Sequence, residues 1–85
     1  MKDEIYFKYV TNTGLKITIL VLKMGHYFEA ARLGLEGDEM TEYMLKKLIL
    51  VNGEELTNNN SFNDMEKAIE AVSSQFVKTP FKVIK

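Results

Sequence analysis

The sequence predicts one small α+β domain, in which an N-terminal antiparallel β-hairpin packs against about three α-helices. A run rich in β-branched and aromatic residues spans about residues 4–22 and predicts the hairpin. Apolar residues at helical spacing then recur in three later segments of the chain. A chain of 85 residues has the size of a single domain, so residues 1–85 are assigned to one folding unit.

The hairpin prediction rests on alternating side chains around a central turn. Apolar residues that alternate with their neighbours would share one face, namely Ile5, Phe7, Tyr9, Leu15, Ile17, Ile19 and Val21. Between the two runs lies Asn12-Thr13-Gly14, and Gly14 can adopt the positive φ that a three-residue hairpin loop requires. Because side chains with a period of two form an apolar face, we expect helices to cover that face.

The first helix is expected over about residues 24–34. Its apolar stripe has spacings of four, three and four and consists of Met24, Phe28, Ala31 and Leu35. Gly34 and Gly37 lie on either side of Leu35 at the end of this stripe, and glycine commonly ends a helix.

The second helix is expected over about residues 38–50. Asp38 can cap it, and Glu39 and Glu42 would lie near the positive end of its dipole. Its apolar face consists of Met44, Leu45, Leu48 and Ile49. The end of this segment has two interpretations. We favour helix, but residues 48–51 before Asn52-Gly53 are also typical of a short strand that enters a turn.

The third helix, over about residues 61–77, has the clearest pattern. Its apolar residues repeat at spacings of three, four, three and four and are Phe62, Met65, Ile69, Val72 and Phe76. Ser61 and Asp64 form a weaker version of the capping box. We expect the stripe to be buried against the hairpin and the second helix. Pro80 then ends helical structure and leaves an extended C-terminal tail at residues 79–85.

The residue types present argue against catalysis, a metal site and a cofactor. The chain contains no cysteine and a single histidine, His26, so a transition-metal site would need carboxylates alone. No serine has a partner base that the sequence supports, and the glycines match no phosphate-binding motif. We therefore expect a protein that is not an enzyme and that binds no cofactor.

The charge pattern argues against specific nucleic-acid binding. Eleven basic and twelve acidic residues give a net charge of -1, and Arg32 is the only arginine. The charged start of the chain leads into no long apolar run, so neither a signal peptide nor a membrane span is expected. Together with the absence of cysteine, this favours a cytoplasmic location.

Surface-exposed apolar residues are the remaining route to function. Tyr43 and Leu50 fall off the main stripe of the second helix, and Met40 has a flexible side chain that suits exchangeable apolar contacts. We therefore take Met40, Tyr43 and Leu50 as candidate partner-binding residues. A contiguous apolar patch on so small a protein would indicate either a partner protein or a homo-oligomer.

The order of these features resembles a known family. A strand pair over residues 7–19 leads into Leu22-Lys23-Met24-Gly25-His26-Tyr27-Phe28, and residues 43–57 then lead into an acidic amphipathic helix. Over roughly residues 7–76 the chain resembles the small tail assembly chaperones of long-tailed bacteriophages (siphophages and prophages). The resemblance implies a protein that binds the tape-measure protein, keeps it soluble during tail assembly, and helps to recruit tail-tube subunits.

Two alternatives stay open at the level of sequence. One is a small regulatory or nucleic-acid-associated protein, in which Lys8, Lys16 and the basic tail would contact phosphates. The other is an accessory protein-interaction module of a different system.

Overall fold

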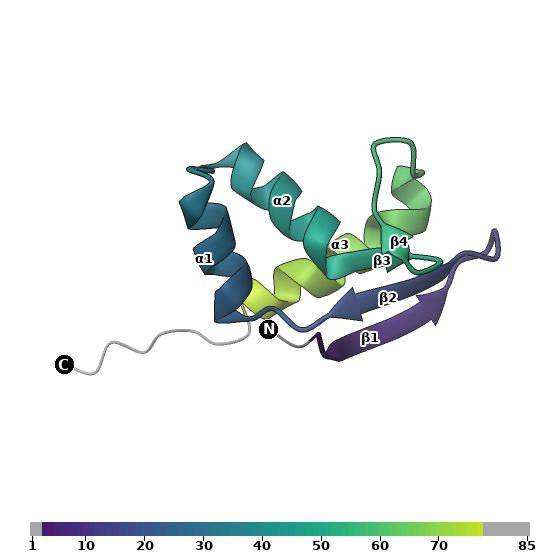
Figure 1. Cartoon of the computed structure of the whole chain (residues 1–85). Coiled ribbons are helices and arrows are strands. Elements are labelled where there is room, and N and C mark those ends of the chain that lie inside the picture. The colour runs from purple at the N-terminus through teal and green to yellow at the C-terminus, as the bar shows by residue number, and fades with distance from the viewer. Residues whose placement is uncertain (1–2, 78–85) are drawn as a thin grey trace.

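The computed structural model describes residues 3–77, which form a four-stranded antiparallel sheet and three helices (Figure 1). The predicted α+β fold class is confirmed. The strands are β1 (Ile5–Val10), β2 (Lys16–Leu20), β3 (Ile49–Val51) and β4 (Glu54–Glu55). The helices are α1 (Met24–Arg32), α2 (Asp38–Leu48) and α3 (Phe62–Val77). The extended tail predicted at residues 79–85 lies outside the described residues.

The strands follow one another in the order β1-β2-β3-β4, so β2 lies between β1 and β3. Ile17 of β2 pairs with Tyr9 of β1 and Val51 of β3, and Ile19 is buried on the same face. The predicted hairpin is confirmed, with a register shift between Ile5 and Phe7. Its loop is the expected one, because Gly14 has a φ of 88° and the Thr11 N–H donates to the Leu15 carbonyl at 2.9 Å.

The favoured helical interpretation of residues 49–50 is wrong, because α2 ends at Leu48 and passes directly into β3. Asn52 and Gly53 both have positive φ, 52° and 85°, which is the geometry of a two-residue hairpin turn into β4. The Asn52 N–H donates to the Lys16 carbonyl at 2.8 Å, and the Asn52 side-chain oxygen accepts from the Lys16 N–H at 2.9 Å. Pairing with β2 on one side and β4 on the other gives the backbone groups of β3 their partners.

Helix α3 covers the apolar face of the sheet and also contacts α2. The core consists of Ile17, Ile19, Leu20, Leu48, Ile49, Val51, Met65, Ala68 and Val72. The predicted stripe of α3 is buried only in its middle, because Phe62 and Phe76 at its ends remain 68% and 52% exposed. A helix of 16 residues is about 24 Å long, whereas the five residues of β2 span about 17 Å, so both ends of α3 extend past the sheet.

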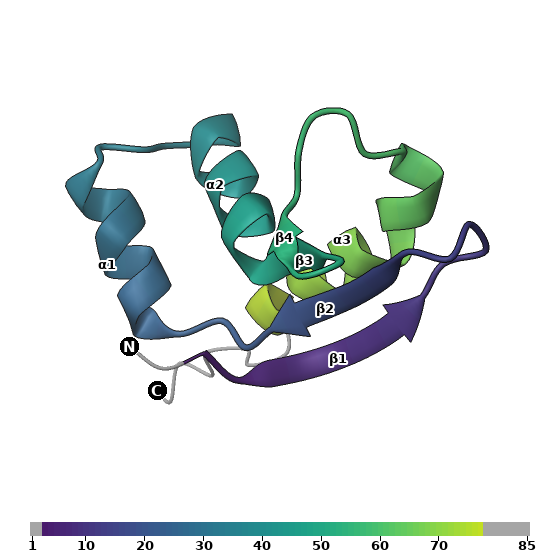
Figure 2. The same ribbon diagram turned by 45° about the vertical axis from the view of Figure 1, so that its right-hand side comes forward.

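The predicted stripe of α1 is not buried. Met24 and Phe28 are 64% and 54% exposed, and the residues of this helix that are buried are His26 and Ala30. Both views show α1 beyond the end of the sheet, beside α2 (Figures 1 and 2). Because α1 packs against α2 instead of covering the sheet, a different face of the helix is enclosed.

Two helix ends also differ from expectation. Helix α1 ends at Arg32, two residues before the predicted end. Gly34 has a φ of 72°, a left-handed conformation that ends helical structure. Gly37 occupies the N-cap position of α2, so the expectation that Asp38 caps this helix is wrong. Asp38 and Glu39 instead occupy its first turn, where negative charge still interacts favourably with the helix dipole.

Among the residues that the structure describes, none of the helices has the length and apolar character needed to cross a bilayer.

Tyr9 joins β1 to α3. Its hydroxyl donates to the Asp64 carbonyl at 2.9 Å and accepts from the Ala68 N–H at 3.1 Å, so it bridges two helix groups that lie four residues apart. Burial raises the pKa of Tyr9 above its ordinary value of 10.0, the hydrogen bond from Ala68 opposes this rise, and the Asp64 charge adds to it. The neutral phenol is therefore the form that stabilises the fold.

We expect Tyr9→Phe to lower the free energy of unfolding by about 1 kcal/mol at neutral pH, because the bridge is lost. The raised folded-state pKa means that this stabilisation is fully present below the unfolded pKa and is lost as pH rises through the folded value. The difference between wild type and Tyr9→Phe should therefore shrink in urea titrations repeated above pH 10. A difference that stays constant with pH would contradict the assigned role.

We expect Leu48→Ala to lower the free energy of unfolding by about 2–5 kcal/mol, because Leu48 is fully buried at the end of α2. Phe62→Ala is the matched control, and we expect a change within about 0.5 kcal/mol because this ring is mostly exposed. Urea denaturation followed by circular dichroism measures both. Similar losses for the two variants would show that the core is assigned wrongly.

Candidate protein-binding groove

An apolar groove of about 320 Å³ lies between α2 and α3, and we refer to it as the α2/α3 groove. It is lined by Met40, Thr41, Met44, Leu45, Val72, Ser73 and Phe76. Among the described residues that line it, Thr41 and Ser73 are polar and none is charged. On the wall formed by α2, Met44 is buried and Met40 is partly exposed, and the flexible thioether side chain of Met40 can adapt to differently shaped apolar groups.

A second hollow of about 440 Å³ lies between α1 and α2. It is lined by Tyr27, Ala31, Gly34, Leu35, Glu36, Gly37 and Met40. Met40 lines both this hollow and the α2/α3 groove, so the two depressions meet at its side chain. At helical spacing Met24 and Phe28 lie on the same face of α1 as Ala31, so the exposed stripe of this helix borders the second hollow.

Acidic side chains gather where α2 begins. Glu36 lines the second hollow, and Asp38 and Glu39 occupy the first turn of α2. Among the described residues none of these three carboxylates makes an ion pair. The apolar depressions are therefore bordered by negative charge at one end, which favours a partner with basic residues beside its apolar face.

The structure separates the three candidate partner-binding residues. Met40 lies in the groove, whereas Tyr43 points elsewhere and donates a hydrogen bond from its hydroxyl to a Glu29 carboxylate oxygen at 2.9 Å. Partial burial and the hydrogen bond to Glu29 raise the pKa of Tyr43. Leu50 is half-buried on β3, paired with Thr18 and Glu55, so placing it on the second helix is wrong. Tyr43 connects α2 to α1, and Leu50 belongs to the sheet.

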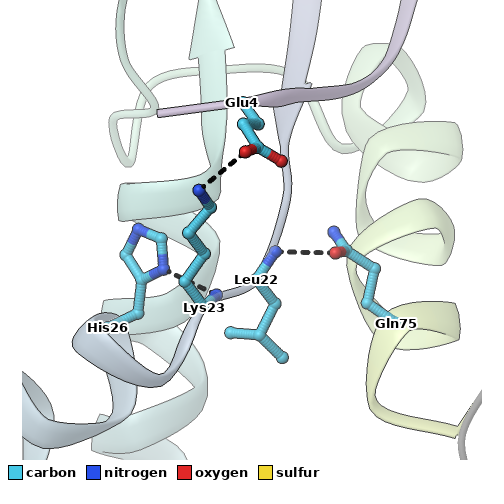
Figure 3. Close-up of polar contacts among 5 residues, drawn as sticks. All are labelled: Glu4, Leu22, Lys23, His26 and Gln75. Carbon is cyan, nitrogen blue, oxygen red and sulfur yellow. Dashed lines mark hydrogen bonds and ion pairs between the residues drawn. The ribbon is translucent and has the colours of Figure 1, made fainter. Parts of the chain in front are cut away.

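The position of α1 depends on the junction that precedes it (Figure 3). Gln75 of α3 accepts from the Leu22 N–H at 2.7 Å and donates to the Leu20 carbonyl at 2.9 Å. The Lys23 N–H donates to Nδ1 of the buried His26 at 3.1 Å, and the Lys23 ammonium lies 3.1 Å from the Glu4 carboxylate. His26 thus caps the start of α1 by accepting a hydrogen bond from the residue before the helix.

We expect Gln75→Ala to lower the free energy of unfolding by about 1–3 kcal/mol, because two part-buried backbone groups would lose their partners. The amide signals of Leu22 and of the first turn of α1 should shift in NMR spectra of the variant. Ser73→Ala is the control, since Ser73 is exposed two residues earlier on the same helix. Spectra of Gln75→Ala that change only around α3 would contradict the role of this residue in holding α1.

Sequence reasoning missed Phe76 and Tyr27 as surface residues. It assigned Phe76 to the buried stripe of α3, yet the ring lies at the mouth of the α2/α3 groove. The length of α3 indicates that its ends are exposed, because a helix of 16 residues is longer than any strand in this short sheet. No sequence feature indicates that Tyr27 is exposed, because tertiary packing decides which side of α1 faces α2.

The two apolar depressions provide surfaces suited to binding. Within residues 3–77 no three His, Cys, Asp or Glu side chains come together in a way that could hold a metal ion. Comparison of the chain with protein-family models, with curated proteins and with solved structures finds no match.

Proposed function

We propose that this protein is a non-catalytic binding domain that holds an apolar helix of a partner protein in the α2/α3 groove. The observation that carries the proposal is an open apolar groove with the partly exposed Met40 on its α2 wall and no charged side chain among the described residues that line it. Following the resemblance, we further propose that it acts as a phage tail assembly chaperone, and that its partner is the tape-measure protein in the bacterial cytoplasm.

A helical partner suits the shape of this surface. Two helices form the walls of the groove, and an amphipathic helix laid between them can place side chains at i, i+3, i+4 and i+7 into it. Met40, which is only partly buried, can adjust to successive, non-identical turns of a long client, because methionine has several rotatable bonds and a polarizable sulfur. The nearby unpaired carboxylates would favour basic residues flanking the apolar stripe of the client.

A chaperone for a long apolar client would act through several copies on each client molecule. Each copy shields a short stretch, and weak contacts allow its release when tail-tube subunits arrive. In this proposal the tail-tube protein is a second, later partner. The exposed stripe of α1 provides a surface through which neighbouring copies on one client could touch as a homo-oligomer.

Co-expression with a tape-measure fragment tests the proposal. Wild-type protein should bring the otherwise insoluble fragment into a soluble complex that tolerates salt, because apolar contacts dominate. Met40→Lys and Phe76→Lys should reduce the recovered complex by about tenfold or more, since each places a charge in the groove. Phe62→Lys is the matched control, because it changes an exposed phenylalanine at the opposite end of the same helix.

Two outcomes would contradict this proposal. One is a fragment that stays insoluble with the wild-type protein. The other is a complex that Phe62→Lys weakens as much as Phe76→Lys, because binding would then not depend on the groove. Circular dichroism of each variant alone separates lost binding from lost folding.

A further inference from the structure

The outer edge of β1 offers backbone groups for another strand. No other described strand pairs with this edge, because β1 lies at the end of the strand order. The Thr11 N–H points toward the second arm of the hairpin, where it donates to Leu15. Since backbone groups alternate along a strand, those of Tyr9 also point toward β2, and those of Lys8 and Val10 point outward.

A hollow of about 280 Å³ lies beside this edge, on the side that faces α3. It is lined by Tyr6, Phe7, Lys67, Glu70, Ala71 and Ser74. Phe7 and Ala71 give it an apolar floor, and the Phe7 ring is 41% exposed although it pairs with the buried Ile19. A side chain that projects from a strand added beside β1 toward α3 would enter this hollow.

The opposite face of the same edge is basic. Lys8 alternates with Phe7 and Tyr9, so it lies on the face away from α3, and Lys16 lies on that face as the partner of Val10. Both lysines are exposed, and among the described residues neither makes an ion pair. Lys8 therefore lies on β1 beside its outward backbone groups, and Lys16 lies one strand further in, across from Val10 on the same face.

We infer that the edge of β1 is a second binding site, which takes an extended partner segment with alternating apolar and acidic residues. Such a segment adds as a fifth strand, a mode of recognition in which backbone hydrogen bonds give affinity and alternate side chains give specificity. Its apolar side chains face the hollow beside α3, and its carboxylates face Lys8 and Lys16. None of the groove residues takes part, so this site is independent of the proposed function.

The test uses the full chain, labelled with nitrogen-15, and short blocked peptides as probes. A peptide of alternating valine and glutamate should bind and shift the amide signals of Lys8 and Val10, whose hydrogen exchange should slow. A peptide of alternating valine and lysine should bind at least about tenfold more weakly, because it brings like charges together. The valine and glutamate peptide with alternate nitrogens methylated keeps the side chains but cannot form the ladder, and it should not bind.

The double variant Lys8→Glu with Lys16→Glu should reverse the preference between the two peptides, by roughly tenfold in each direction at low salt. Both side chains are exposed and unpaired, so the fold should persist, and circular dichroism checks this. Three outcomes would overturn the inference: no binding of the acidic peptide up to its solubility limit, equal binding of the two charged peptides, or binding that survives backbone methylation. Each is separate from the outcome of the tape-measure experiment.

Discussion

The structure depends on burying one face of β2 while both of its edges are paired. Ile17 and Ile19 lie at the centre of the sheet, with β1 on one side, β3 on the other and α3 above them. Both side chains are almost fully enclosed, and burial of apolar surface stabilises a fold by about 25 cal/mol per Å². Without cysteines, no covalent link supplements this core.

The small size of this core explains where apolar surface remains exposed. The sheet is narrow and short, so it covers only the middle of α3 and leaves the rings at both ends in solvent. Helix α1 has no sheet face to cover and packs against α2, so most of its own apolar stripe is exposed. The exposed ends of α3 and the exposed stripe of α1 thus have one cause. The helices carry more apolar surface than the small sheet can cover.

Two modes of recognition are compatible with this architecture. The groove between two helices suits an apolar helix, whereas the edge of β1 suits an extended segment. They also differ in chemistry, because carboxylates border the helical surfaces and unpaired lysines flank the edge of the sheet. A protein with two such sites could hold one partner while engaging another.

The sequence by itself determined the fold class, the hairpin with its turn at Gly14, and the approximate extent of the three helices. These follow from local periods and turn chemistry, which act over a few residues. Tertiary structure alone decided that residues 49–51 form a strand, because β2 and β4 lie on either side to satisfy their backbone groups. It also decided which apolar residues are exposed: Met40 lies in the groove and Leu50 in the sheet, since a stripe of apolar residues does not specify how much of it a neighbouring element can reach.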